Sequence, residues 1–347
     1  MVNPDAWNGR KVLVTGHTGF KGSWLAHWLL EMGANVVGYA LAPQSDVSLF
    51  NVLRLGDRID TYLEDINDLV ALNGCVESQQ PDVVFHLAAQ SLVRTGYQDP
   101  TGTLSTNIMG TANLLEAVRQ LPNRCRVVVV TSDKCYRNDE SGRRYDEEEP
   151  LGGHDPYSAS KAAAEIVAAS YRNSFAGDKL KIASARAGNV IGGGDWAEDR
   201  LVPDLVRAWT EKRTLQVRHP EAIRPWQHVL EPISGYLLLA EQLCEPGIAS
   251  AWNFGPDADD VVSVGDLLQL AAGRWPELSI HCQPDEGPHE AATLLLDSQK
   301  ACTQLSWRPR WRLEEALDRT LDWYQAWREG RDMLSISSQQ FADYLRS

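Results

Sequence analysis

The chain has 347 residues, which is enough for two domains or for one large α/β unit with an appended region. Its 33 basic and 47 acidic residues give a net charge of −14, which argues against nucleic acid or an anionic membrane as the main partner. The six cysteines form no C-x-x-C or Cys/His cluster, so we expect no metal site and no disulfide framework. Neither a signal-peptide core nor an apolar stretch of membrane-spanning length is present, so we expect a cytoplasmic protein.

Strands and helices alternate along the first half of the chain. We expect strands over residues 11–15, 35–39, 82–87, 126–131 and 181–186. We expect helices over residues 22–32, 103–120 and 157–174. This alternation predicts an α/β fold with a Rossmann-type, doubly wound parallel sheet. After Asn189 the alternation stops, and the change predicts a first domain over residues 1–187, with segments near 225–256 returning to it, and a smaller mixed α/β domain over residues 188–347.

A glycine-rich string joins the first expected strand to the first expected helix. It reads Gly16-His17-Thr18-Gly19-Phe20-Lys21-Gly22, a G-x-x-G-x-x-G pattern. Glycines in such a loop allow a tight turn and let backbone N–H groups reach a pyrophosphate at the helix N-terminus. The second strand ends without the acid that would bind an adenosine ribose and without an arginine for a 2′-phosphate. We therefore expect NAD rather than NADP, held with modest affinity, with Asp65 either as an adenine contact or as a solvated loop acid.

Two short strings carry residues suited to proton transfer. Ser132, Asp133 and Lys134 follow a run of four valines that is typical of a buried parallel strand, so they lie at the sheet edge where such folds bind ligands. Tyr157 and Lys161 are four residues apart and share one face of a helix. A lysine ammonium in that position stabilises a phenolate, so we expect it to lower the tyrosine pKa and make Tyr157 a usable base. The added acid and lysine indicate more than a simple alcohol oxidation.

The motifs together resemble the sugar-nucleotide branch of the extended short-chain dehydrogenase/reductase family. In family order stand the glycine loop, His86-Leu87-Ala88-Ala89-Gln90, Asn107 before Gly110, the Tyr157/Lys161 pair and Arg186-Ala187-Gly188-Asn189. Further strings resemble the dehydratases of that branch that act on CDP-glucose: Thr131-Ser132-Asp133-Lys134-Cys135-Tyr136, Gly188 to Trp196, and Arg224-Pro225-Trp226-Gln227-His228. Related GDP-mannose and dTDP-glucose dehydratases usually carry Glu at the position of Lys134.

The resemblance implies a hydro-lyase that converts CDP-D-glucose to CDP-4-dehydro-6-deoxy-D-glucose for deoxysugar and lipopolysaccharide biosynthesis. It assigns the first domain to NAD and the second mainly to the nucleotide sugar. The expected cofactor-binding residues are Gly16, His17, Gly19, Phe20, Gly22, Asp65, Ile66, Leu87, Ala88, Ala89, Asn107, Thr131, Tyr157 and Lys161. The expected substrate-binding residues are Gln90, Asn189, Arg200, Arg218, Arg224 and His289. Arginine suits the diphosphate because its guanidinium fork matches phosphate oxygens.

The expected catalytic residues are Ser132, Asp133, Lys134, Tyr157 and Lys161. Tyr157 takes the C4 hydroxyl proton, Ser132 holds the C4 oxygen, and Asp133 donates a proton to the departing C6 hydroxyl. Lys134 is either the base that removes the C5 proton or a cation that stabilises the C4 enolate, with a structural salt bridge as a third possibility.

Other functions on the same scaffold remain open at this point. They are a dehydratase for a dTDP-, UDP- or GDP-sugar, a sugar-nucleotide 4-epimerase, and a non-catalytic NAD-sensing protein. Family habit also implies a homodimer, or a tetramer, in which helix 103–120 and the helix carrying Tyr157 pack across a two-fold axis as a four-helix bundle.

Overall fold

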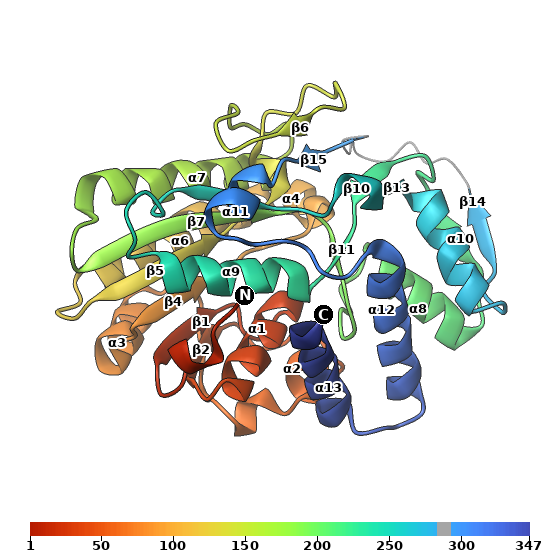
Figure 1. Ribbon diagram of the computed structural model, residues 1–347, viewed down its shortest axis with the longest axis horizontal. Coiled ribbons are helices and arrows are strands. Elements are labelled where there is room, and N and C mark those ends of the chain that lie inside the picture. The colour runs from red at the N-terminus through yellow and green to blue at the C-terminus, as the bar shows by residue number, and fades with distance from the viewer. Residues whose placement is uncertain (283–292) are drawn as a thin grey trace.

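Seven parallel strands form the central sheet of the protein, with helices on both faces (Figure 1). The computed structural model describes residues 1–282 and 293–347. In spatial order the strands are β12 (Ala251–Phe254), β7 (Leu180–Ala187), β5 (Cys125–Val130), β4 (Val83–His86), β1 (Lys11–Thr15), β2 (Asn35–Ala40) and β3 (Asp60–Leu63). The Rossmann-type parallel sheet is therefore confirmed, while the domain boundary at residue 187 stays a prediction. β12 adds a strand from the second half of the chain beside β7.

The alternating side chains of β5 show how the sheet is enclosed. Val128 and Val130 belong to the hydrophobic cluster that includes α1 (Phe20–Glu31) and α9 (Leu230–Gln242). Val127 and Val129 belong to the opposite cluster, which includes α3 (Leu69–Gln79), α6 (Gly110–Arg119) and α7 (Pro156–Phe175). A run of valines suits a strand buried on both faces, because successive side chains point to opposite sides.

The helix expected over residues 103–120 is divided in the structure. It consists of α5 (Pro100–Leu104), a π-helical turn over Ser105–Met109, and α6. Asp99 caps the start, because its carboxylate accepts the Gly102 N–H at 2.9 Å. A π-turn adds one residue to a helical turn, and nothing in the composition of this segment marks the extra residue, so the local pattern did not predict it.

Shorter elements form the region beside the carboxyl edge of the sheet. The small sheets pair β8 (Val190–Ile191) with β11 (Gln227–His228), β9 (Leu215–Val217) with β14 (Ile280–Cys282), β10 (Ile223–Pro225) with β13 (Val261–Ser263), and β6 (Arg144–Tyr145) with β15 (Leu295–Leu296). The remaining α-helices are α2 (Leu49–Val52), α4 (Val93–Gln98), α8 (Leu201–Glu211), α10 (Val264–Arg274), α11 (Gln299–Gln304), α12 (Leu313–Arg328) and α13 (Met333–Arg346).

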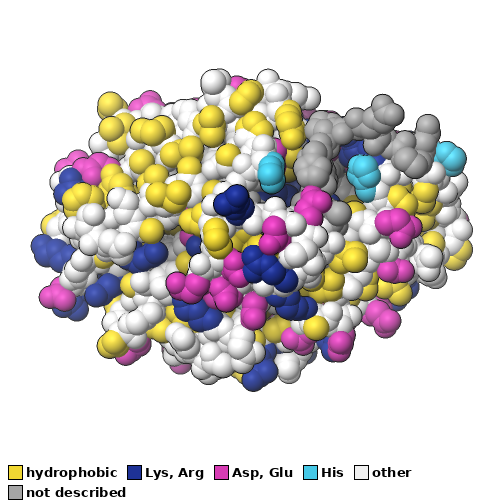
Figure 2. Space-filling view, turned by 90° about the horizontal axis from the view of Figure 1, so that it is seen from above, with side chains coloured by type: hydrophobic (Ala, Val, Ile, Leu, Met, Phe, Trp, Pro, Cys, Tyr) yellow, Lys and Arg dark blue, Asp and Glu magenta, His cyan; other side chains and the backbone are white. Residues whose placement is uncertain are grey.

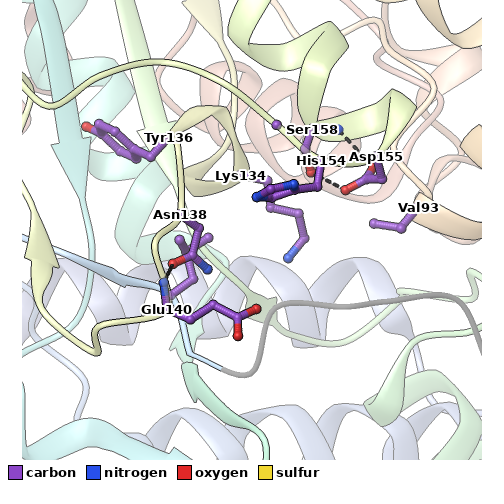
Figure 3. A pocket seen from close by; sticks show the side chains of 10 residues that line it. Val93, Lys134, Tyr136, Asn138, Glu140, His154, Asp155 and Ser158 are labelled. Carbon is purple, nitrogen blue, oxygen red and sulfur yellow. Dashed lines mark hydrogen bonds between the residues drawn. The ribbon is translucent and has the colours of Figure 1, made fainter.

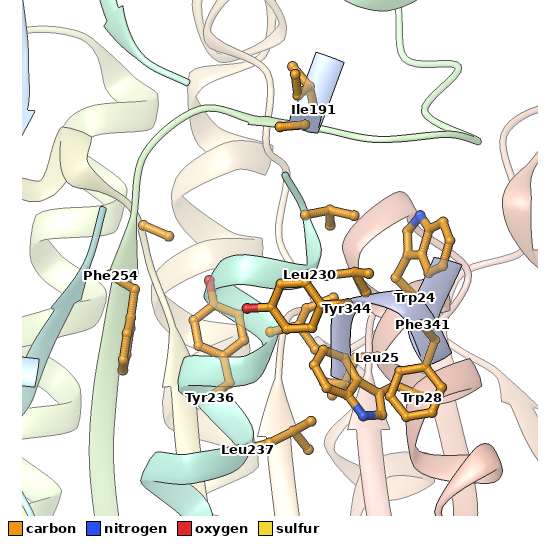
Figure 4. Close-up of a cluster of buried hydrophobic side chains, with 14 of the residues drawn as sticks. Trp24, Leu25, Trp28, Ile191, Leu230, Tyr236, Leu237, Phe254, Phe341 and Tyr344 are labelled. Carbon is orange, nitrogen blue, oxygen red and sulfur yellow. The ribbon is translucent and has the colours of Figure 1, made fainter. Parts of the chain in front are cut away.

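The C-terminal helix α13 packs against α1 on one side of the molecule (Figure 4). The Trp28 ring lies 4.9 Å from that of Phe341 and 5.6 Å from that of Tyr344. The Tyr344 hydroxyl donates to Glu231 Oε2 of α9 at 2.7 Å. These contacts join the last helix to the helices that cover the sheet.

Hydrophobic and charged side chains are distributed unevenly over the surface. Figure 2 shows hydrophobic side chains gathered over the left part of the face viewed from above, and basic and acidic side chains mixed near its centre. None of the helices within residues 1–282 and 293–347 combines the length and hydropathy needed to cross a membrane.

Candidate active site

Ser132 and Asp133 stand where β5 ends, at the carboxyl edge of the sheet. The Ser132 hydroxyl donates to Asp133 Oδ1 at 2.8 Å and accepts the Lys134 N–H at 3.2 Å, which closes a short 3₁₀ turn over Asp133–Cys135. Asp133 is 2% exposed, and its Oδ2 atom has no hydrogen-bond partner among the described residues. A Cβ on Gly188 would lie 3.1 Å from that oxygen, so Asp133 faces the end of β7. A buried carboxyl oxygen without a partner is suited to meet a ligand group.

Helix α7 brings Tyr157 and Lys161 to the same place. Asp155 caps the helix by accepting the Ser158 N–H at 3.0 Å, and Pro156 occupies the first turn. Tyr157 and Lys161 are both buried, and the Lys161 ammonium donates to the Val130 carbonyl oxygen of β5 at 3.5 Å. The structure therefore brings the expected pair together with the residues at the end of β5.

The pKa of Tyr157 in the structure differs from the one expected from its spacing to Lys161. Burial raises the pKa of Tyr157 to about 12, although its hydrogen bond with Ser132 acts in the opposite direction. Burial lowers the pKa of Lys161 to about 8, opposed mainly by the charge of Glu165. The predicted lowering of the Tyr157 pKa is therefore wrong, because desolvation of the phenolate outweighs the hydrogen bond with Ser132 and the charge of Arg200.

Lys134 directly follows Asp133 in the 3₁₀ turn after β5. Its half-buried side chain extends into a pocket beside His154 and Val93, with Glu140 further along the wall (Figure 3). Within the described part of the chain, no ion pair joins Lys134 to Asp133. A structural salt bridge between these neighbours is thus not formed, and the base and enolate roles stay open.

The glycine loop has the shape expected of a dinucleotide cradle. Gly16 has a φ of 75°, and a Cβ there would lie 2.7 Å from the Ala88 nitrogen. A Cβ on Gly22 would lie 2.1 Å from the Gly16 oxygen. Gly19 caps α1 without a side-chain hydrogen bond, so the first backbone N–H groups of the helix remain for an anion. The loop therefore fits a pyrophosphate.

Several expected cofactor residues lie around this cradle. His17 is fully buried, and its ring packs on Gly38 and edge-on to Phe50 at 5.3 Å. Asp65 is exposed in the turn after β3, where its carboxylate accepts the Asn67 N–H at 2.9 Å. The other expected residues lie at strand ends or in the loop itself: Phe20, Ile66, Leu87, Ala88, Ala89 and Thr131.

Asn107 and Gln90 are bonded to other protein groups. The Asn107 amide donates to the Gln90 carbonyl oxygen at 2.9 Å and to Ser160 Oγ of α7 at 2.7 Å. The Gln90 side chain donates to Leu92 and Thr103, each at 2.9 Å. The π-turn that carries Asn107 therefore ties the loop after β4 to the helix that holds Tyr157.

The expected substrate residues come from several different elements and loops. The Arg200 guanidinium donates to Asp195 at 2.9 Å and to Ser91 at 3.1 Å, and its charge acts on Tyr157. Arg218 lies 3.7 Å from the Asp199 carboxylate. Arg224 is buried on β10, and Asn189 is half-buried after β7. His289 lies outside the described residues.

Two charged residues near the site were not assigned from the sequence. Lys21 of the glycine loop has its pKa lowered to about 8 by burial and by Arg200 and Lys161. Glu165, on the same helix as Tyr157, is 2% exposed. Its place four residues after Lys161 continues the spacing of the pair, and that spacing is the signal that could have identified it.

Comparisons with known proteins agree with this geometry. The profile of the GDP-mannose 4,6-dehydratase family matches residues 13–320. CDP-glucose 4,6-dehydratase of Salmonella typhimurium strain LT2 is 48% identical over 99% of each chain. Two crystal structures share the fold. One is dTDP-glucose 4,6-dehydratase of Bacillus anthracis in complex with NAD, which has a TM-score of 0.78 and 23% identity, with 94% of this chain and 100% of that chain covered. The other is UDP-glucose 4-epimerase of Thermotoga maritima with UDP-glucose, which has a TM-score of 0.79 and 23% identity, with 90% of this chain and 98% of that chain covered.

The epimerase and the dehydratase match the fold about equally, so the fold alone does not choose between these activities. The family profile covers most of the chain, and it agrees with the resemblance found in the motifs. The chain belongs to the GDP-mannose 4,6-dehydratase family.

Proposed function

We propose that this chain is an NAD-dependent sugar-nucleotide 4,6-dehydratase that converts CDP-D-glucose to CDP-4-dehydro-6-deoxy-D-glucose in deoxysugar biosynthesis. The observation that carries the proposal is the buried Asp133 beside Ser132 and Tyr157, with one carboxyl oxygen unpartnered among the described residues. A 4-epimerase needs no acid for a C6 hydroxyl, whereas a dehydratase does. Asp133 therefore favours elimination over epimerisation.

The choice of nucleotide is supported by the relative from Salmonella typhimurium, which is 48% identical and is named for CDP-glucose. Lys134 supports the same choice, because the related GDP-mannose and dTDP-glucose dehydratases usually carry Glu at this position. The alternatives are a dTDP-, UDP- or GDP-sugar as the substrate.

The glycine loop supports NAD as the cofactor. Its N–H groups at the start of α1 would hold the pyrophosphate, and Ala88 and Ala89 would line the nicotinamide side. When bound, NAD would supply the acceptor for the C4 hydride and return that hydride at C6.

The chain's own residues would perform the first half of the reaction as follows. Tyr157, as a phenolate stabilised by Lys161, accepts the proton of the C4 hydroxyl and becomes a neutral phenol. The Ser132 hydroxyl, which lies beside the Tyr157 phenol, holds the C4 oxygen in line. The 4-ketone that forms makes the C5 proton acidic.

The second half would use Asp133 and Lys134. Lys134 removes the C5 proton when neutral or stabilises the enolate when charged, while protonated Asp133 donates its proton to the C6 hydroxyl. Water then leaves, and the conjugated enone would gain the hydride at C6 and a proton at C5 to give the product. Arg200, Arg218 and Arg224 are proposed to hold the diphosphate, and Gln90, Asn189 and His289 are proposed as further substrate-binding residues.

A panel of CDP-, dTDP-, UDP- and GDP-glucose, each with added NAD⁺, tests the proposal. We expect a 4-keto product, seen by its absorbance in alkali, with CDP-glucose. Product from another nucleotide alone would shift the substrate assignment. Recovery of CDP-galactose without keto product would identify a 4-epimerase, and no conversion of any sugar would leave the NAD-sensing alternative.

We also propose a homodimer built through α6 and α7. Apolar side chains are exposed along these helices and the segment before them, namely Leu104 (36%), Met109 (54%), Ile166 (60%) and Phe175 (49%). Such a surface favours a helical interface between two copies. The six free cysteines favour a reducing compartment, which supports a cytoplasmic location.

A further inference from the structure

A buried carboxylate joins three elements behind the proposed catalytic pair. Glu165 of α7 accepts hydrogen bonds from Thr131 Oγ1 at the end of β5, from Ser184 Oγ of β7 at 2.7 Å, and from Arg186 Nη2 of β7 at 2.8 Å. The side chains of Glu165 and Arg186 are 2% and 4% exposed. Thr131 directly precedes Ser132 and Asp133, so Glu165 fixes the point from which those residues project.

The ion pair continues into a wider network. Arg186 donates to the Tyr136 hydroxyl at 2.7 Å, and that hydroxyl donates to Asn253 Oδ1 of β12 at 2.7 Å. The charges are thus compensated and their hydrogen-bonding groups largely occupied. A buried ion pair of this kind is weak evidence for stability, because desolvation offsets much of its attraction. Its position against the site is therefore the more informative feature.

Glu165 also acts on Lys161 through space. Tyr157, Lys161 and Glu165 are spaced four residues apart on one helix, so their side chains lie along one face. Glu165 supplies negative charge around Lys161, and the Cys135 thiol would add to it when ionised. Together with burial, the charge of Lys161 in turn lowers the pKa of His86 and that of Lys21. Burial keeps the Cys135 thiol and the His86 imidazole neutral near pH 7.

We propose that Glu165 is a positioning residue of this site, which anchors the end of β5 through Thr131 and supplies the negative charge that keeps Lys161 a cation. The importance of a charged Lys161 for catalysis rests on the proposed function, but its charge state can be measured without any substrate. Loss of the Glu165 charge would leave desolvation unopposed and turn Lys161 into a neutral amine near pH 7, unable to stabilise a Tyr157 phenolate.

The test is an NMR titration of lysine carbons labelled at Cε. The chain has eight lysines, and the Lys161 signal is assigned by its loss in K161R. We expect the Lys161 midpoint to fall by about one pH unit or more in E165Q and in the double variant E165Q/R186M. The double variant removes both charges together and so avoids an unpaired buried arginine. Where enzyme activity is present, the alkaline limb of its pH profile should move by the same amount.

Ser184→Ala is the matched control, because it removes a neutral hydrogen bond to the same carboxylate and keeps the charge. We expect the Lys161 midpoint in S184A to equal that of the wild type. An equal shift in S184A, or no shift in either Glu165 variant, would overturn the proposal. If neither Glu165 variant folds, the wild type decides: a Lys161 midpoint below about pH 7 shows that Glu165 does not keep the lysine charged. A wild type inactive on every sugar would refute only the proposed function.

Discussion

Replacing Asp133 by Asn should separate the oxidation half of the reaction from the elimination. The Ser132 hydroxyl can still donate to Oδ1, as it does at 2.8 Å in the wild type, so the turn after β5 is kept. The other carboxyl oxygen, buried and unpartnered among the described residues, would be replaced by an amide NH₂ that also lacks a partner. An unsatisfied buried group costs about 1–3 kcal/mol, which a domain of ordinary stability tolerates.

The kinetic effect of D133N should be larger than its effect on stability. Loss of a general acid lowers the rate by roughly 10²–10⁴-fold, which corresponds to about 3–5 kcal/mol in the barrier to elimination. Removal of the C4 proton by Tyr157 does not need Asp133. We therefore expect reduced nicotinamide to accumulate when D133N is mixed with CDP-glucose and NAD⁺, while the 4-keto-6-deoxy product forms slowly.

The assay follows reduced nicotinamide by absorbance and the product by its absorbance in alkali. D68N is the control, because Asp68 caps α3 and asparagine caps a helix nearly as well. D68N should behave as the wild type in both readings. Product formed by D133N at the wild-type rate would refute the acid role of Asp133. Loss of product without reduced nicotinamide would show that Asp133 serves the oxidation half instead.

Three further changes test other parts of the molecule. In K134M, C5 solvent-hydrogen exchange should be lost if Lys134 is the base, and normal exchange would eliminate that role. Burial raises the pKa of Glu231 from 4.5 to about 7, so between these pH values the folded state holds a proton that the unfolded state has released. The free energy of unfolding should therefore fall by about 3 kcal/mol as the pH rises over that range. E231Q should remove this pH dependence in denaturant titrations, and an unchanged pH dependence would contradict the assignment. Ile166→Arg should convert the proposed dimer to a monomer in sedimentation experiments, whereas the same change leaving the dimer intact would place the interface elsewhere.

Local sequence patterns predicted most of the Rossmann-type sheet. Five strands were expected within two residues of their observed bounds, because apolar runs between glycines and polar turns mark buried strands clearly. β3 was missed because this edge strand has no fully buried residue and so carries no apolar signal. β12 was not predicted as a strand, because it lies in a stretch where the alternation of strands and helices has ended, although its residues fall within the segment 225–256 that was expected to return to the first domain.

The sequence by itself determined which residues meet at the carboxyl edge of the sheet. Ser132 and Asp133 follow a strand, Tyr157 and Lys161 share a helical face, and parallel strands end at one edge, so their convergence depends only on local periodicity and on the handedness of the fold. Only the tertiary structure decided the charge state of that site. The pKa of Tyr157 is raised and that of Lys161 is lowered by burial, and Glu165 meets Arg186 from a different element. Desolvation and through-space charge depend on the positions of groups distant in sequence, and no local pattern records those positions.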